Sequence, residues 1–393
     1  MFDRKIKIGV AGLGRAFQLM LPAFLADPRV SLVAAADPRA EASARFRSDF
    51  AAETFSSVEE MCARSSADAI YVATPHQFHA ENVVAAARAK KHVLVEKPMA
   101  LDLEDCRRMI EATERAGVFM VVGHSHSFDA PVRRTAELIA SGEFGPLRMI
   151  GAINYTDFLY RPRRPEELST ESGGGVVFNQ APHQVDVMRL LAGPARSVRA
   201  ATGAWDPGRP TEGAYGAFIS FENGAFASLS YSGYAHFDSD ELTGWIAESG
   251  YAKDPEKYGA ARAVLRGISA ADELELKLAR NYGGAEATAM QTPSGPRAHQ
   301  HFGLIVASCE QADLKPTPKG VMIYGDFGRR FEALPEPKVP RVEVMDELCD
   351  AIVRRHPPLH DGRWGLATME VCLAILQSSR EGREIGLKHQ RGN

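Results

Sequence analysis

The segment Ile6-Lys-Ile-Gly-Val-Ala-Gly-Leu-Gly-Arg-Ala-Phe17 decides the fold of this chain. It begins with the apolar residues of a buried strand, and Gly12 and Gly14 then lead into a helical pattern. A glycine turn between a strand and a helix gathers backbone N–H groups at the positive end of the helix dipole, which suits a dinucleotide pyrophosphate. Phe17 stands where the usual GxGxxG pattern has its third glycine, so the motif is incomplete.

Neighbouring residues extend the predicted dinucleotide site. Arg15 and Ala16 open the helix after the glycine turn and would line the same pocket. Asp37 follows the predicted strand 30–36, where an acid hydrogen-bonds the adenosine ribose and repels a 2′-phosphate. Arg39 would accept that phosphate, so we predict NAD as the cofactor and keep NADP as the alternative.

Apolar strands alternate with amphipathic helices through residues 1–123. The strands are expected at Ile6–Val10, Val30–Ala36, Ala69–Ala73, Val93–Val95 and Phe119–Val122, and the helices at Ala16–Ala26, Arg39–Phe50, Ser57–Ala63, Phe78–Ala89 and Leu103–Ala116. Asp102 is a candidate cap for the last helix, and Gly117 ends it. This order predicts a doubly wound parallel sheet, with residues 1–125 forming an NAD(P)-binding Rossmann domain.

The pattern changes after Ala130. Longer strands, several with alternating polarity, are expected at Arg148–Thr156, Ser197–Trp205, Ala214–Phe221 and Ala225–Tyr231, and helices at Val342–Arg354 and Arg363–Arg380. Asn223-Gly224 favours a tight turn between two antiparallel strands. We therefore predict that residues 126–393 form an α+β domain that binds substrate through a mostly antiparallel open sheet with helices on one face. Residues from about 235 to 317 are expected to be an insertion that shapes substrate access.

Composition narrows the classes of function. The chain has 393 residues, is 45% hydrophobic and carries a formal net charge of −4, which argues against nucleic-acid and anionic-membrane partners. The five cysteines are scattered and form no CxxC pair, which favours a reduced compartment over disulfides or a thiolate metal site. Short apolar runs and a start that leads directly into a strand indicate neither a membrane span nor a signal peptide. We expect a cytoplasmic enzyme with a small-molecule substrate.

Glu96-Lys97-Pro98 follows the predicted strand 93–95, at the sheet edge where open α/β sheets bind ligands. Burial beside a nicotinamide cation would make the Lys97 amine easier to deprotonate, and the amine would then take a hydroxyl proton as hydride leaves carbon. Glu96 would line the cofactor site. A purely structural ion pair between Lys97 and Glu96 is the alternative.

Two further polar loops follow strands of the first domain. Thr74, Pro75 and His79 are expected to line the nicotinamide and its ribose. His124 and His126 are expected to contact the substrate, unless they belong to a plain polar loop. With His76, the two loops place four histidines near one sheet edge, a number that could bind zinc. Neither loop contains a cysteine or an HExxH acid, so we predict no metal.

The run Gly173-Gly-Gly-Val-Val-Phe-Asn-Gln-Ala-Pro-His-Gln-Val-Asp186 joins flexible glycines to a predicted helix. On a continuous helix Asn179, His183 and Asp186, at i, i+4 and i+7, would share one face. Such a run is more often the packed start of a helix than an active site, so the prediction rests on its combination with Lys97 and the glycine turn.

A basic loop lies just before this run and has the sequence Tyr160-Arg161-Pro-Arg163-Arg164-Pro-Glu-Glu167. Guanidinium groups bind carboxylates through two hydrogen bonds at once, so this loop is suited to an anionic substrate. A solvated surface loop is an equally good explanation.

Together these residues resemble the glucose–fructose oxidoreductase / inositol dehydrogenase (Gfo/Idh/MocA) family. The resemblance is carried by Gly12-Leu-Gly14, Asp37, Thr74-Pro75, Glu96-Lys97-Pro98, the run 173–186 and the ending Pro358…Asp361-Gly362…Gly365…Glu370…Ala374…Ser378…Gly382. It implies a Rossmann domain, a second domain with an open antiparallel sheet, and a homodimer or homotetramer formed through that sheet.

The resemblance also implies a reaction, in which a secondary alcohol is oxidised or the ketone reduced, with Lys97 as general acid/base and His183, together with Asn179, contacting the substrate and orienting its hydroxyl. Asn179 stands where the family usually has an aspartate; it can hydrogen-bond but cannot ionise, which shifts proton transfer toward Lys97.

The chain looks most similar to a branch that oxidises a cyclic cis-diol bearing carboxylates, for which Arg161, Arg163 and Arg164 would serve. A sugar or inositol dehydrogenase or reductase is the first alternative. A non-catalytic NAD(H)-sensing regulatory protein, suggested by Asn179, is the second.

Overall fold

The computed structural model describes residues 4–234, 236–257, 259–287 and 297–390. These residues form two compact units. The first contains residues 4–124, 274–287 and 341–369, and the second contains the other described residues from 125 to 390. Two segments from beyond residue 126 therefore group with the amino-terminal strands, and each unit has a sheet of its own.

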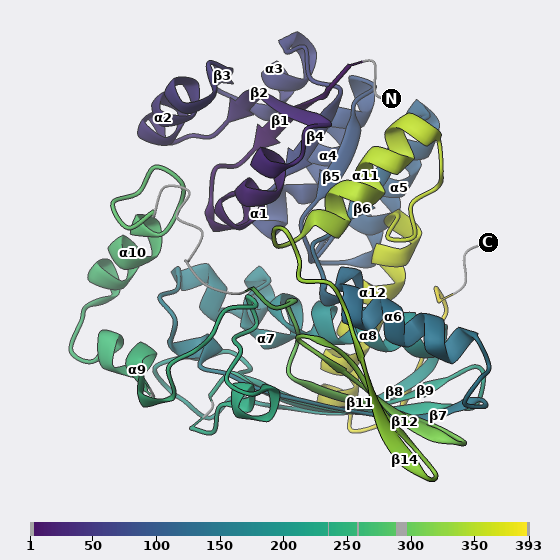
Figure 1. The fold of residues 1–393 in the computed structure, drawn as a ribbon. Helices are drawn as coiled ribbons and strands as arrows, with labels where there is room; N and C mark the ends of the chain where they lie inside the picture. The colour runs from purple at the N-terminus through teal and green to yellow at the C-terminus, as the bar shows by residue number, and fades with distance from the viewer. Residues whose placement is uncertain (1–3, 235, 258, 288–296, 391–393) are drawn as a thin grey trace. The chain divides into compact units, whose positions relative to one another are not determined.

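The first unit is built on a six-stranded parallel sheet with the order β3-β2-β1-β4-β5-β6 (Figure 1). The strands are β1 (Ile6–Ala11), β2 (Val30–Ala36), β3 (Glu53–Phe55), β4 (Ala69–Val72), β5 (His92–Val95) and β6 (Met120–Val122). The predicted doubly wound parallel sheet is confirmed. The analysis missed β3, which is three residues long and only half-buried at the sheet edge.

The helices of the first unit follow the predicted pattern closely. They are α1 (Arg15–Ala26), α2 (Ala40–Phe50), α3 (Val58–Arg64), α4 (His79–Arg88), α5 (Leu103–Ala116) and α11 (Val342–Arg354). The Asp102 carboxylate accepts a hydrogen bond from the Asp105 N–H at 2.8 Å and caps α5. Gly117 ends the same helix in the left-handed region at φ +68°, as expected for a residue without Cβ.

Residues 274–287 pack on the first unit through Tyr282. The Tyr282 ring is 5% exposed; its centroid lies 5.1 Å from that of Phe17, and it also contacts Phe46 and Phe50. Its hydroxyl donates to the Asp49 carboxylate at 2.7 Å. Phe17, at the place of the missing third glycine, is therefore part of a buried aromatic cluster.

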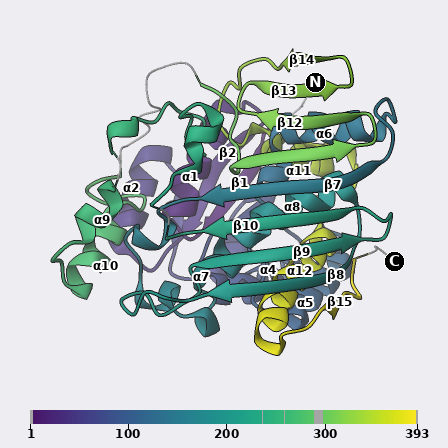
Figure 2. The same ribbon diagram turned by 90° about the horizontal axis from the view of Figure 1, so that it is seen from below.

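The second unit is built on a nine-stranded sheet with the order β14-β13-β12-β11-β7-β10-β9-β8-β15, whose strands run side by side in Figure 2. They are β7 (Leu147–Tyr155), β8 (Ala195–Gly203), β9 (Ala214–Phe221), β10 (Phe226–Ser232), β11 (Leu304–Cys309), β12 (Ala312–Thr317), β13 (Gly320–Gly325), β14 (Gly328–Ala333) and β15 (Ile385–Gly386). Neighbouring strands are antiparallel except β7 and β10, so the predicted mostly antiparallel sheet is confirmed.

Helices cover one face of this sheet. Helix α6 (Ala130–Ala140) packs on β12 and β13, and α8 (Ala181–Ala192) packs on β7 and β10. In Figure 2 both helices lie behind the strands. Large apolar side chains on the sheet strands are exposed, among them Met149 (41%), Ile153 (38%) and Phe218 (45%).

The segment expected to be an insertion contains both sheet strands and short helices. Strands β11 and β12 lie within residues 235–317 but belong to the sheet, so the expected insertion extends too far along the chain. Pro316 inside β12 obscures the strand pattern, because proline cannot donate to a strand ladder. Helices α9 (Ala260–Leu265) and α10 (Ala270–Ala279) lie in the same segment. Residues 235, 258 and 288–296 of this segment lie outside the described residues.

The expected continuous helix through Asn179 and His183 is interrupted. Helix α7 (Gly175–Asn179) ends before Gln180, and α8 begins at Ala181 with Pro182 in its first turn. Proline lacks an N–H and its ring clashes with the carbonyl four residues before it, so one helix cannot continue through this point. The prediction that Asn179 and His183 share a helical face is therefore wrong.

The final helix, α12 (Gly362–Glu381), agrees with the predicted segment 363–380. Among the described residues, no helix is both long and apolar enough to cross a membrane.

Candidate active site

The glycine turn has the geometry that a dinucleotide requires. Gly12 has φ +93°, and a Cβ atom there would lie 2.8 Å from the Ala73 carbonyl oxygen. Gly14 is the N-cap of α1 and has no side chain that could cap the helix, so the backbone N–H groups of the first turn, which includes Arg15 and Ala16, face the glycine turn. This turn can hold a pyrophosphate.

Asp37 and Arg39 form an ion pair that also contacts the glycine turn through Leu13. The Asp37 carboxylate accepts from the Leu13 N–H at 2.7 Å and from Arg39 Nε at 3.0 Å. Arg39 also donates from Nη2 to the Leu13 carbonyl oxygen at 2.7 Å and from Nη1 to the Tyr282 carbonyl oxygen at 3.4 Å. The Asp37 side chain is 6% exposed and that of Arg39 is 31% exposed. The guanidinium is therefore the more accessible group, which the sequence motif alone did not show.

His79 joins two loops of the first unit. Its ring is fully buried; Nδ1 lies 3.0 Å from the Pro98 carbonyl oxygen and Nε2 lies 2.9 Å from that of Thr74. Burial lowers the pKa of His79 despite these backbone contacts. Because both ring nitrogens face backbone, His79 positions the loop that holds Thr74 and Pro75 against the loop that follows Lys97. Its direct contact with a cofactor stays a prediction.

Glu96 and Lys97, at the carboxyl end of β5, differ in their surroundings. Glu96 is 6% exposed; it accepts from the Tyr71 hydroxyl at 2.6 Å and lies 3.8 Å from Arg341 Nη1. Lys97 is half-buried, and the peptide bond that follows it is cis. His124, the last residue of the amino-terminal segment of the first unit, is buried. Glu96 therefore belongs to a buried polar contact, while Lys97 keeps partial access at the predicted ligand edge of the sheet.

In the second unit the imidazole ring of His183 packs against the rings of His126 and Phe302. Its ring centroid is 4.8 Å from that of His126 and 5.1 Å from that of Phe302, which stacks on Tyr231 at 5.9 Å. His183 is 5% exposed and Phe302 is 1% exposed. Asp186, on the same helix as His183, accepts from the Ser125 hydroxyl at 2.6 Å. Helix α8 thus brings the predicted His183 and His126 together.

His126 is held between two carboxylates. Its Nδ1 lies 2.6 Å from Asp129 Oδ2, and its Nε2 lies 3.4 Å from Glu248 Oε1. Burial opposes a charge on this ring, but the two carboxylates outweigh burial and raise the pKa of His126 to about 9. His126 is therefore a buried imidazolium at neutral pH.

Asn179, the last residue of α7, binds back to the glycine run at the start of that helix. Its Nδ2 donates to the carbonyl oxygens of Gly175 at 2.8 Å and Gly173 at 3.3 Å. An ionised aspartate in this place would point oxygen at both carbonyls, which explains locally why the chain has an amide here. The geometry gives Asn179 a role in the loop; its predicted contact with substrate stays a prediction.

The three arginines of the basic loop have different surroundings. Arg161 pairs with Asp157 at 2.9 Å and is 44% exposed. Arg163 is 8% exposed, donates to the Phe158 carbonyl oxygen at 2.6 Å and stacks 3.6 Å above that residue's ring. Burial lowers the pKa of Arg163 to about 10. Arg164 pairs with Glu167 at 3.4 Å. Arg163 therefore supports the loop, and Arg161 is the most exposed of the three cations.

The sequence analysis missed Glu248, Phe302 and Asp129. The spacing of His126 and Asp129, three residues apart, was a usable signal for their contact. Glu248 is 122 positions from His126 and lies in a segment without a recognisable motif, so no local pattern pointed to it.

Comparison with known proteins identifies the family. Residues 6–124 match the oxidoreductase family Gfo/Idh/MocA with an NAD-binding Rossmann fold, and residues 132–247 match the carboxyl-terminal domain of that family. The chain is 48% identical, over 95% of both chains, to 1-carboxy-3-chloro-3,4-dihydroxycyclohexa-1,5-diene dehydrogenase of Comamonas testosteroni.

Solved structures agree in fold. A protein of Bordetella bronchiseptica RB50, whose assignment as a dehydrogenase is itself provisional, matches with a TM-score of 0.91 and 46% identity over 98% of this chain and 100% of that one. The WlbA dehydrogenase of Bordetella pertussis, solved with NADH and UDP-GlcNAcA, shares the fold at a TM-score of 0.68 and 24% identity, over 98% and 99% of the two chains. The chain therefore belongs to the Gfo/Idh/MocA family and is an NAD-dependent dehydrogenase whose first unit contains its NAD-binding Rossmann domain.

Proposed function

We propose that this enzyme oxidises a secondary alcohol of a cyclic cis-dihydrodiol that carries carboxylate, with NAD as the oxidant. Phthalate 4,5-cis-dihydrodiol, which would give 4,5-dihydroxyphthalate, is the substrate we expect. The observation that carries the proposal is the 48% identity, over 95% of both chains, to an enzyme named for a carboxylated dihydroxycyclohexadiene. Such a reaction belongs to the breakdown of aromatic compounds, for which we expect a cytoplasmic enzyme.

The residues of the first unit suit their proposed roles. NAD, when bound, would take hydride from the carbinol carbon. The glycine turn at Gly12 and Gly14 would hold its pyrophosphate, and Asp37 its adenosine ribose. Lys97, half-buried at the end of β5, would accept the hydroxyl proton. Loss of hydride and proton leaves an enone that tautomerises to an aromatic diol, which draws the reaction forward.

The second unit supplies groups that suit a polar anionic ring. His183 would orient the hydroxyl, and the neighbouring Phe302 offers an apolar face. His126 and the exposed Arg161 carry positive charge, which favours carboxylates on the substrate. Arg163 and Arg164 would support this loop more than the substrate itself, since both are paired within it.

The exposed apolar strand side chains support an oligomer. Met149, Ile153 and Phe218 belong to the central strands of the nine-stranded sheet, and a second subunit would remove them from water. We propose a homodimer or homotetramer through this sheet. Light scattering of purified protein would test it, and a monomer at micromolar concentration would contradict it.

A sugar or inositol substrate is the second candidate. It is favoured by 32% identity to 1,5-anhydro-D-fructose reductase of Ensifer adhaerens, over 51% of this chain and 58% of that protein. Absorbance at 340 nm, recorded with NAD or NADP and either the dihydrodiol or a panel of polyols, separates the candidates. NADH formation with the dihydrodiol alone would support the first proposal, and formation with a polyol alone would replace it with the second.

A further inference from the structure

A small hairpin presents Glu248 to the second unit. The Ala247 N–H donates to the Tyr251 carbonyl oxygen at 2.8 Å, and the Gly250 N–H donates back to the Ala247 carbonyl oxygen at 2.7 Å. Glu248 therefore lies in the turn, and its own carbonyl oxygen accepts from the His301 N–H at 3.4 Å. The backbone that carries this carboxylate is fixed.

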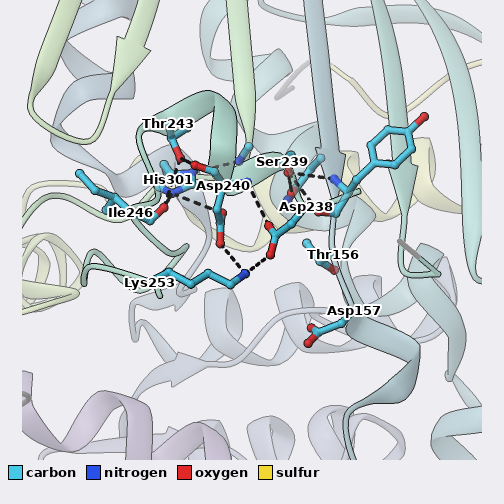
Figure 3. A network of polar contacts seen from close by, with 12 residues as sticks. Thr156, Asp157, Asp238, Ser239, Asp240, Thr243, Ile246, Lys253 and His301 are labelled. Atoms are coloured by element: carbon cyan, nitrogen blue, oxygen red, sulfur yellow. Dashed lines mark hydrogen bonds and ion pairs between the residues drawn. The ribbon is translucent and has the colours of Figure 1, made fainter. Parts of the chain in front are cut away.

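A polar network fixes the base of the hairpin (Figure 3). Lys253 donates to the carboxylates of Asp238 and Asp240, and the His301 ring lies 2.7 Å from the Ile246 carbonyl oxygen. Ser239 accepts from the N–H of Tyr155, at the end of β7. The segment from Asp238 to Lys253 is therefore attached to the sheet by hydrogen bonds. The backbone of Glu248 is held in place while its side chain contacts His126.

The two carboxylates on the His126 ring are not equivalent. Asp129 is 4% exposed and lies 2.6 Å from Nδ1, whereas the Glu248 side chain is 34% exposed and lies 3.4 Å from Nε2. A charged hydrogen bond of this kind is normally shorter than 3 Å. Asp129 is thus the permanent partner of the imidazolium, and Glu248 makes a longer contact with the other ring nitrogen through a side chain that is itself one-third exposed.

The surroundings of Glu248 strongly favour an anion. Burial opposes its charge, but His126, Arg161 and His301 outweigh burial and lower the pKa of Glu248 to about 2. The other carboxylates of this region are already paired: Asp129 with His126, Asp157 with Arg161. The positive charges of His126 and Arg161 therefore favour one further carboxylate on the Nε2 side of His126, whose ring lies next to that of His183.

We propose that the Nε2 side of His126, together with Arg161, is a subsite for a substrate carboxylate, and that Glu248 occupies it until the substrate displaces its side chain. This inference rests on the proposed function and deepens it, because it names the groups that recognise the carboxylate. Rotation of the Glu248 side chain is sufficient, since its backbone stays bound in the turn. A diol without a carboxylate has no means to displace Glu248.

Binding to the NADH-loaded protein tests the subsite. The probes are 3,4-dihydroxybenzoate and catechol, which differ by one carboxylate, and the measurement is titration calorimetry. In Glu248→Gln the competing negative charge is removed, so affinity for 3,4-dihydroxybenzoate should rise about tenfold while that for catechol stays within twofold. Glu241→Gln is the matched control, because Glu241 is an exposed glutamate of the same segment; it should change neither affinity.

A second variant tests the subsite without relying on Glu248. Arg161→Gln should weaken 3,4-dihydroxybenzoate binding about tenfold and leave catechol binding unchanged. Equal changes for both probes in Glu248→Gln, or no change for either, would overturn the inference and make Glu248 a structural partner of His126. If the enzyme still oxidises the dihydrodiol, the proposed function survives that result. If wild type binds neither probe and oxidises no dihydrodiol, both proposals fail.

Discussion

The buried imidazolium of His126 predicts a specific loss of stability at alkaline pH. Its pKa is raised from 6.5 to about 9 in the folded protein. A raised pKa means that the folded protein binds the His126 proton more tightly than the unfolded chain does. This proton therefore stabilises the folded state fully below pH 6.5, and the stabilisation disappears as the pH rises through about 9. Each pKa unit corresponds to about 1.4 kcal/mol, so the shift corresponds to about 3 kcal/mol of unfolding free energy. His126 is almost fully buried, so solvent screens little of this effect.

Urea unfolding at pH 6.5 and 10, compared with His126→Gln, measures this contribution. Burial also raises the pKa values of the Cys62, Cys106 and Cys349 thiols, so their ionisation destabilises the folded protein at alkaline pH. Both proteins contain these thiols, and their contribution cancels in the comparison. Wild type should lose about 3 kcal/mol more than the variant over this range. A proton NMR titration of the His126 ring gives the pKa directly. Equal losses in the two proteins, together with a His126 pKa near 6.5, would refute the reasoning.

Substitutions at three positions probe the first unit. Lys97→Ala should lower kcat about a thousandfold and leave NADH affinity within a few-fold in calorimetry, because the amine serves proton transfer; near-normal turnover would remove it from the mechanism. Gly12→Ala places a Cβ atom 2.8 Å from the Ala73 carbonyl oxygen at φ +93°, so NADH binding should weaken at least about tenfold; unchanged affinity would contradict the predicted cradle. Tyr282→Ala should cost about 3 kcal/mol in urea unfolding and Tyr282→Phe about 1 kcal/mol, since only the first removes the ring; equal losses would contradict the aromatic packing.

Most of the first unit could be predicted because its signals are local. The strand at 6–11, the glycine turn and the capped helix Leu103–Ala116 are each specified by neighbouring residues, and the structure has all three. Strand β3 was missed because three residues, none of them fully buried, give no periodic pattern. Strand β12 was missed because Pro316 interrupts the pattern while the sheet tolerates it.

The second unit shows where sequence patterns fail. A continuous helix was expected through Asn179 and His183, but Pro182 was a visible warning, because proline belongs in the first turn of a helix and not in its interior. The contact between His126 and Asp129 was readable from their spacing, but the contact with Glu248 spans 122 positions and depends on how the hairpin folds. Long-range contacts of this kind require the tertiary structure.

The central claim is that the enzyme recognises a carboxylated cyclic dihydrodiol and oxidises it with NAD. Its most direct test is kcat/KM for phthalate 4,5-cis-dihydrodiol and for benzene cis-dihydrodiol, both with NAD and followed at 340 nm. We expect the carboxylated substrate to be preferred at least about a hundredfold, because a charged hydrogen bond that contributes about 3 kcal/mol corresponds to a ratio of about this size. Equal values for the two diols, or turnover of polyols but of neither diol, would contradict the account.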